Sequence, residues 1–442
     1  MAFGIELPEL ASDNDKMIYF LYNTFLTFLL IPLILYLLLR SIAQKGFRSV
    51  LAQRMGTFGN HSLKSPIWVH AASVGEVFCS VSLLKRMKKE FPHEEIVMTT
   101  MTSTGKRAAE TYLPEVNTVF LVPMDHPLIL RRAMNNLRPR LLLIAETELW
   151  PNLLRSCGKR GIPIILFNGR ISQKSFRRYH LFQFFFEGCL KFISLFLMQT
   201  EEDCLRIQKL GAESRKTRVV GNIKFDQSPP SSTQEKSKEL AGSLGLGGRE
   251  TLLIAGSTHL GEEEILISAF KDLRKIDPQL ILLLAPRHLD RLEEVEKLLR
   301  KESISWKRRT AFPSLREEKT TGEVILLDTM GELMSLYRFG TIVFIGGSLV
   351  PVGGHNPLEA LFFQKPVLFG PHMFHFSEIA QQLVEAKGAI QVNGREELFL
   401  HLKRLLSDER ARRELGEKGF RFLEKHQGAT ERILEEIRPF LV

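Results

Sequence analysis

The chain has 442 residues, more than one hydrophobic core usually serves, so we expect two domains. Its 44% hydrophobic content excludes a disordered chain, and its four widely spaced cysteines form neither a disulfide framework nor a zinc motif, which predicts reduced thiols in the cytosol. The excess of 60 Lys and Arg over 50 Asp and Glu favours an anionic partner: a phosphate-bearing substrate, an acidic membrane surface or nucleic acid.

A membrane anchor is predicted near the N-terminus. Residues 1–16 form a short acidic tail, and no residue from Met17 to Leu39 is charged. At about 1.5 Å per residue this run makes a helix of about 34 Å, enough for a hydrocarbon core of about 30 Å. Basic residues follow it, so the positive-inside rule predicts a single-pass anchor at 17–40 with the remainder of the chain in the cytosol. A buried core helix is the alternative.

The remainder of the sequence predicts two doubly wound α/β domains, at 41–226 and 241–442. Nearly continuous apolar runs alternate with polar-faced helical stretches, a pattern typical of parallel sheets covered on both faces. The polar, proline-containing segment 227–240 predicts a linker, and the last helices are candidates for crossing back to the first domain. The expected strands are Ile67–Ala72, Ile96–Thr100, Thr118–Pro123, Leu141–Ala145, Ile164–Asn168, Phe196–Gln199, Val219–Ile223, Leu252–Ala255, Ile281–Ala285, Val324–Leu327, Ile342–Ile345 and Val367–Phe369.

Segments with polar residues and glycines follow these strands, where α/β domains bind ligands. The longest, GGSLVPVGGHNPLEA at 346–360, places Asn356 as an N-cap and Pro357 at the first helical position. Its helix start suits a phosphate, and Glu359 suits a ribose diol, although ordinary helix capping explains the same residues equally well. Neither a P-loop nor a G-x-G-x-x-G motif is present in the sequence, so ATPase and dinucleotide-enzyme functions lose their usual support.

Six of these blocks together carry a resemblance to a known family. HAASVGE (70–76), ETELWPN (146–152), GNIKFD (221–226), PRH (286–288), DTMGEL (328–333) and GGHNPLEA (353–360) occur in the order and spacing of the 3-deoxy-D-manno-octulosonic acid (Kdo) transferases. The likeness runs from about residue 17 to the C-terminus. It implies a GT-B fold, with two Rossmann-like domains and a cleft between them, and a place in lipopolysaccharide biosynthesis at the inner membrane.

The resemblance also implies a reaction: inverting transfer of Kdo from CMP-Kdo to the tetraacyl lipid A precursor, lipid IVA, without a metal. Glu76 matches the base that takes the acceptor proton, although by itself it reads as a first-turn carboxylate beside a helix dipole. Glu146 and Lys224 match residues that stabilise the transition state. The matched CMP-binding positions are Pro286, Arg287, Met330, Gly331, Glu332, Asn356, Pro357, Leu358 and Glu359, with Ser257, His288 and His355 as neighbouring candidates.

Membrane lipid is a further expected partner. The segment Ser175–Phe186 mixes basic and aromatic residues in a pattern suited to a lipid interface, and a buried aromatic helix would explain the same letters. Two other functions stay open: a UDP-sugar transferase of the same fold, and a non-catalytic, membrane-anchored nucleotide- or nucleic-acid-binding protein. The sequence contains no interleaved RNA-binding motif, so we expect no nucleic-acid partner.

Overall fold

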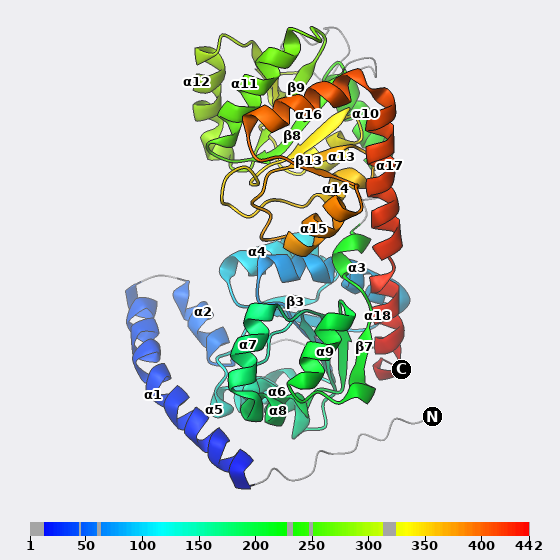
Figure 1. The fold of residues 1–442 in the computed structure, drawn as a ribbon. Helices are drawn as coiled ribbons and strands as arrows, with labels where there is room; N and C mark the ends of the chain where they lie inside the picture. Colours follow the sequence, from blue (N-terminus) through cyan, green and yellow to red (C-terminus); the bar gives the residue numbers. More distant parts are fainter. Residues whose placement is uncertain are drawn as a thin grey trace. The chain divides into compact units, whose positions relative to one another are not determined.

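A computed structural model describes residues 13–43, 46–59, 63–227, 233–246, 251–312 and 324–441. The chain forms two compact units (Figure 1). Unit 1 comprises residues 1–226 and 427–442, and unit 2 comprises residues 227–426. Most of the expected acidic tail lies outside the described residues, and so does 228–232 of the expected linker. The remainder of that linker overlaps helix α10 (Thr233–Ser243).

Unit 1 contains a parallel sheet with the strand order β3-β2-β1-β4-β5-β6-β7. Its strands are β1 (Ile67–His70), β2 (Ile96–Thr100), β3 (Thr118–Leu121), β4 (Leu141–Ala145), β5 (Ile164–Gly169), β6 (Leu195–Met198) and β7 (Thr217–Val219). Its helices are α1 (Asp13–Ala43), α2 (Phe47–Arg54), α3 (Val74–Glu90), α4 (Ser103–Tyr112), α5 (Pro127–Leu137), α6 (Pro151–Gly158), α7 (Gln173–Leu181), α8 (Gln183–Leu190), α9 (Glu201–Lys209) and α18 (Ala429–Ile437).

Alternate residues of the strands pack on opposite faces of this sheet. Ile67 and Val69 of β1 are buried in one apolar cluster, whereas Trp68 is buried in another. The strands of unit 1 are therefore covered on both faces, as their continuous apolar runs predict. The last predicted strand of this unit was placed wrongly, because β7 ends at Val219 and a 3-10 turn at Ile223–Asp226 follows it.

Unit 2 contains a second parallel sheet, with the strand order β10-β11-β9-β8-β12-β13-β14. Its strands are β8 (Leu252–Thr258), β9 (Ile281–Pro286), β10 (Trp306–Arg308), β11 (Val324–Leu326), β12 (Ile342–Ile345), β13 (Val367–Phe369) and β14 (Ile390–Gln391). Its other helices are α11 (Glu262–Arg274), α12 (Leu292–Lys301), α13 (Leu333–Tyr337), α14 (Leu358–Leu361), α15 (Ser377–Glu385), α16 (Arg395–Ser407) and α17 (Glu409–His426). The two edge strands, β10 and β14, were not predicted because they are very short and only partly buried.

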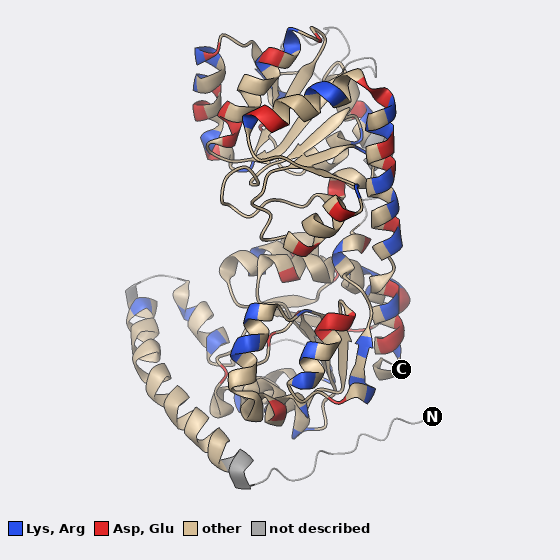
Figure 2. Ribbon diagram, in the orientation of Figure 1, with Lys and Arg blue, Asp and Glu red and all other residues tan. Residues whose placement is uncertain are grey.

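Helix α1 runs along one side of unit 1 (Figure 1) and docks on it through polar contacts of its first turns. The Tyr22 hydroxyl donates to Asp125 Oδ2 at 3.2 Å, and Asn152 Nδ2 donates to Asn23 Oδ1 at 2.8 Å. Its Met17–Ile42 segment is long and apolar enough to cross a membrane, and Figure 2 shows almost no charge along it. The side chains of Phe25 and Phe28 are 65% and 71% exposed, so the face of α1 directed away from unit 1 is apolar.

Helix α18 returns the end of the chain to unit 1. Asp226 Oδ1 accepts from the backbone N–H of Gly428 at 2.7 Å, and its other carboxylate oxygen accepts from the N–H of Thr430. Ile433 and Leu434 of α18 are buried in the same apolar cluster as Val69 of β1. The last helix therefore completes one face of the first sheet.

We expect Asp226→Ala to loosen α18, because loss of a side-chain cap costs about 0.5–2 kcal/mol. Hydrogen exchange should show reduced protection of the α18 amides, with unit 2 unchanged. Asp408→Ala serves as the control, since Asp408 caps an amide near the start of α17, that of Ala411, in unit 2. Unaltered protection of α18 in Asp226→Ala would contradict this account of how the helix is held.

Candidate active site

The order of strands in unit 1 reverses direction between β1 and β4. In open α/β sheets, the loops that leave the carboxyl ends of two such strands diverge and form a binding crevice. The loop after β1 leads to Glu76 in the first turn of α3, and the loop after β4 begins with Glu146. Two of the predicted catalytic carboxylates thus lie at the switch point of this sheet.

Glu76 is held at the start of α3 by its own local sequence. Ser73 is the N-cap, and its hydroxyl donates to Glu76 Oε1 at 2.8 Å while the N–H of Ala72 donates to Oε2 at 2.8 Å. The residue is only 8% exposed. Burial raises the pKa of Glu76 to about 7 against these hydrogen bonds, and the nearby carboxylates of Glu146 and Glu148 add to the rise. A carboxylate with a pKa near neutrality suits a general base.

Glu146 lies beside Lys224, and their predicted roles stay a prediction. The backbone of Glu146 is left-handed, with φ of 55°, which is unusual for a residue with a side chain. Its Oε1 is 3.9 Å from Lys224 Nζ and 4.0 Å from the Sγ of Cys79, one turn beyond Glu76 in α3. Burial raises the pKa of Cys79 to about 12, so this thiol stays protonated and is no nucleophile at neutral pH.

Asn168 positions the segment that carries Lys224. It is fully buried at the end of β5 and is also left-handed, with φ of 54°. Its Oδ1 accepts from the N–H of Ile223 at 3.1 Å, the first residue of the 3-10 turn that contains Lys224. The sequence marked Asn168 only as the last residue of an expected strand, because the contact with Ile223 joins residues 55 apart.

The predicted nucleotide residues lie in unit 2, after β9, β11 and β12. Arg287 follows β9, and its N–H donates to Thr258 O at 3.0 Å. Burial raises the pKa of the half-buried Glu359 to about 7, while a hydrogen bond from Asn356 Nδ2 at 3.4 Å and the charge of Arg287 act in the opposite direction. The structure therefore brings Arg287, Asn356 and Glu359 together.

Helix α14, whose start was expected to bind a phosphate, begins one residue later than predicted. Helix α14 begins at Leu358 and has four residues, so Pro357, predicted at the first helical position, occupies the N-cap position. Asn356 lies one residue before that cap, and its Oδ1 accepts from the N–H of Leu358 at 3.1 Å. Such a short helix has little dipole to offer, and one of its free N–H groups is already bonded.

Glu262, which the sequence gave no reason to single out, organises the Gly-rich loop after β12. Its buried carboxylate accepts from the N–H groups of Gly347 at 2.6 Å, Ser348 at 2.9 Å and Leu349 at 2.8 Å, and from that of His259 at 3.0 Å. These amides are therefore taken by the protein itself. They are not free to bind a phosphate.

Histidine side chains lie next to this loop, close to Gly347. His259 Nε2 and His355 Nε2 are 2.9 Å apart in two nearly parallel rings whose centroids lie 5.2 Å apart, and His288 meets the ring of His259 edge-on. A hydrogen bond between two imidazoles needs one donor and one acceptor, so both rings cannot be charged at once. Burial, followed by the charges of His259 and Arg287, lowers the pKa of His355 to about 4, which keeps this ring neutral at pH 7.

The remaining predicted positions follow β11. Met330 is 63% exposed, and Gly331 is left-handed with φ of 86°. Glu332 pairs with Arg309, whose Nε lies 3.3 Å from its Oε2. Glu332 thus fixes the segment, while the Met330 side chain is exposed. Within the described ranges, no three His, Cys, Asp or Glu side chains gather as metal ligands, and metal independence stays a prediction.

Comparison with known proteins identifies the family. The family model described as 3-deoxy-D-manno-octulosonic-acid transferase (kdotransferase) matches residues 49–227. The chain is 38% identical over 414 residues to the 3-deoxy-D-manno-octulosonic acid transferase of Haemophilus influenzae, covering 93% of this chain and 96% of that protein. It is 31% identical over 424 residues to the Rickettsia bellii protein of the same name, covering 94% and 98%.

A solved structure shares the fold at low identity. The UDP-GlcNAc 2-epimerase from Neisseria meningitidis bound to UDP-GlcNAc superimposes with a TM-score of 0.55 at 11% identity, covering 84% of this chain and 98% of that chain. At this identity the likeness shows the fold alone, which is GT-B with two Rossmann-like units. Because the two transferases match this chain over nearly their full lengths, the chain belongs to the Kdo transferase family and is a glycosyltransferase.

Proposed function

We propose that this Kdo transferase of lipopolysaccharide biosynthesis uses CMP-Kdo as the donor and the tetraacyl lipid A precursor, lipid IVA, as the acceptor, with inversion at the anomeric carbon. The observation that supports it best is the buried Glu76 carboxylate, whose pKa is about 7, beside Glu146 and Lys224 at the switch point of unit 1. An acceptor hydroxyl must lose a proton as it attacks, and this site offers a base of matched strength.

The chemistry follows from the positions of the three side chains. Glu76 takes the proton of the acceptor hydroxyl as its oxygen attacks the anomeric carbon and the bond to CMP breaks. Positive charge then develops on the sugar ring, where the Glu146 carboxylate stabilises it. Lys224, 3.9 Å from Glu146, offsets the negative charge of the Kdo carboxylate and of the departing CMP.

Unit 2 recognises the nucleotide in this proposal. Arg287 holds the phosphate with a charge-assisted contact, and Glu359 accepts from the ribose hydroxyls. The segment Pro286, Met330, Gly331 and Glu332 lines the base, while Asn356, Pro357 and Leu358 shape the turn beside the ribose. We propose that no metal takes part, because Arg287 and neutral imidazoles of unit 2 provide cationic and hydrogen-bonding groups for the phosphate.

We also propose that α1 anchors the chain in the inner membrane, with both units on the cytoplasmic side. Leu181, Phe182 and Phe184 of the basic and aromatic segment are 75%, 58% and 59% exposed, and these apolar side chains suit a lipid surface. A single pass would carry the start of α1 across the bilayer and break the contacts of Tyr22 and Asn23 with unit 1. Those contacts favour α1 lying in the cytoplasmic leaflet, docked on unit 1, with the single pass as the alternative.

Glu76→Gln tests the base. We expect transfer by the wild type to rise with pH up to about 7 and then level, because only the ionised carboxylate accepts a proton. Glu76→Gln should lower single-turnover transfer by about 10²–10⁴-fold, without this pH dependence, while CMP binding persists. Glu90→Gln, at the other end of α3, is the matched control. Near-normal transfer by Glu76→Gln would leave Glu76 as a helix-end carboxylate.

Arg287→Ala tests the nucleotide site. Loss of a charge-assisted contact of about 1.5–3 kcal/mol should weaken CMP binding about 10- to 100-fold in calorimetry. Glu359→Ala should act similarly through the ribose, and Lys297→Ala, on the exposed side of α12, should have no effect. A CMP affinity equal to that of the wild type in both Arg287→Ala and Glu359→Ala would contradict the proposed nucleotide site. Stronger competition by UDP than by CMP would favour a UDP-sugar transferase.

The mode of anchoring has its own test. Deleting residues 1–40 should release much of the protein from membranes and preserve CMP binding, since the nucleotide candidates lie in unit 2.

The orientation of α1 can be tested by thiol labelling. The four native cysteines are buried, so labelling of a thiol introduced by Met17→Cys can be measured without interference from them. We expect a membrane-impermeant maleimide applied to intact spheroplasts to leave it unlabelled. Labelling of this thiol in intact spheroplasts would establish a single pass. Cleavage of the C-terminal part of the chain by a protease added outside the spheroplasts would refute the cytoplasmic location of the two units.

A further inference from the structure

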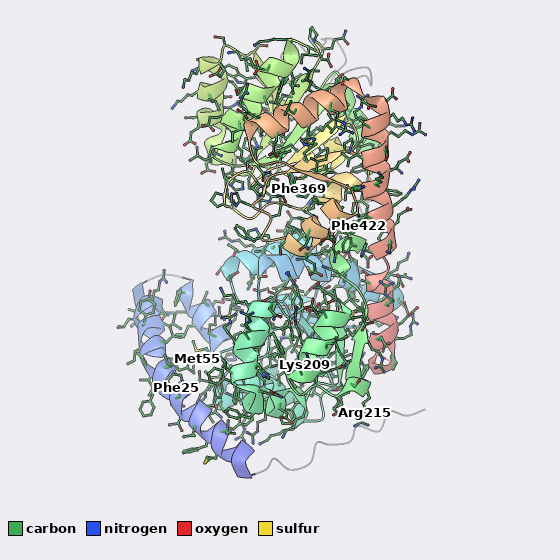
Figure 3. The ribbon with its side chains drawn as sticks, in the orientation of Figure 1. Phe25, Met55, Lys209, Arg215, Phe369 and Phe422 are labelled. Atoms are coloured by element: carbon green, nitrogen blue, oxygen red, sulfur yellow. The ribbon has the colours of Figure 1, made fainter. Side chains whose placement is uncertain are left out.

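A cavity of about 530 Å³ lies between part of α1 and the body of unit 1, and none of the steps above uses it. Leu26, Leu30, Leu33 and Leu37 of α1 form one wall. These four leucines recur at helical spacing, so a single stripe of α1 faces the cavity. Met55, at the end of α2, packs with Leu30 beside it and is labelled in Figure 3.

The opposite wall comes from the edge of the sheet that carries the proposed catalytic residues. Met101 follows β2, Met124 follows β3, and Trp150 follows β4. Trp150 belongs to the same loop as Glu146, four positions further along the chain. Because the carboxyl ends of parallel strands share one edge, the cavity lies along the same edge of the sheet as Glu76 and Glu146.

Arg54 gives this apolar cavity a positive charge. Its Nη1 donates to Val122 O at 2.9 Å, and its Nη2 donates to Met101 O. Over the described parts of the chain, no carboxylate forms an ion pair with it. Asp125, which also lines the cavity, uses its carboxylate to accept from the N–H groups of Asn152 at 3.0 Å and Leu153 at 2.8 Å. The cavity therefore combines an apolar wall with a cation suited to an anionic group.

The outer side of α1 indicates where such a ligand comes from. Phe25, labelled in Figure 3, and Phe28 are exposed on that side, and Leu33, which lines the cavity, is itself 43% exposed. The apolar surface is thus continuous from the lipid-facing side of α1 into the cavity. A molecule with an acyl chain and a phosphate, arriving from the membrane, fits both the wall and the charge.

We propose that this cavity holds one acyl chain of the acceptor glycolipid, with Arg54 contacting an acceptor phosphate. The proposal rests on the function proposed above, since it names how unit 1 receives that acceptor. Its chain-binding wall is built from the anchor helix itself. Helix α1 then forms part of the substrate site as well as the membrane attachment.

Two pairs of variants test the proposal in the full-length enzyme. Leu33→Trp fills the cavity, and Leu29→Trp makes the same change at a residue that is 54% exposed and does not line it. Arg54→Gln removes the charge, and Arg48→Gln does so at an exposed residue of the same helix. We expect Leu33→Trp and Arg54→Gln to raise KM for lipid IVA about tenfold or more, with KM for CMP-Kdo unchanged and both controls near wild type. Equal effects of each variant and its control would overturn the proposal.

Photocrosslinking separates this proposal from the proposed function. Lipid IVA carrying a diazirine on an acyl chain should label peptides of α1 and of the Met101 and Trp150 loops, and it needs no turnover to do so. Crosslinks elsewhere, with normal Kdo transfer, would overturn the cavity assignment and leave the function standing. Crosslinks in the cavity without any transfer would support the lipid site and refute the function. A diazirine phosphatidylethanolamine that labels the cavity and is not displaced by lipid IVA would overturn the choice of acceptor.

Discussion

The parallel direction of every paired strand is the constraint on which the candidate site depends. In each sheet the carboxyl ends of the strands lie along one edge, so residues far apart in the sequence meet there. Glu76 follows β1, Glu146 follows β4, and Lys224 follows β7. Strand direction places all three residues at one edge of the sheet, and the hydrogen bond from Ile223 to Asn168 helps bring Lys224 to within 3.9 Å of Glu146. The same rule places Arg287 and Glu359 at one edge of the sheet in unit 2.

Backbone conformation shows where this arrangement is costly. Glu146, Asn168 and Ser257 all have positive φ, between 54° and 57°, and each lies at the end of a strand. A residue with a side chain adopts this conformation at a cost of about 1–3 kcal/mol, and such residues cluster at functional sites. The strain turns the chain sharply after the strand, which directs the Glu146 side chain toward Lys224 and the Asn168 amide toward Ile223.

The sequence predicted most of the buried strands, but few of the long-range contacts that set the pKa values and positions of the site residues. Continuous apolar runs such as Leu141–Ala145 predict central strands because both faces of the sheet are covered, whereas Trp306–Arg308, charged and at an edge, has no such pattern. The block motifs identified Glu76, but its raised pKa depends on burial by distant segments. Glu262 and Asn168 act through contacts 85 and 55 residues away, which no local pattern contains.

The return of α18 to unit 1 has a consequence for the order in which the protein folds during synthesis. Ile433, Leu434 and Ile437 belong to the core that covers one face of the first sheet, yet they are made after all of unit 2. Domains fold as units while the chain emerges from the ribosome. Unit 2, contained in residues 227–426, is complete before these residues appear. Unit 1 therefore reaches its final core later than unit 2, and a nascent chain holds an uncovered sheet face until α18 has been made.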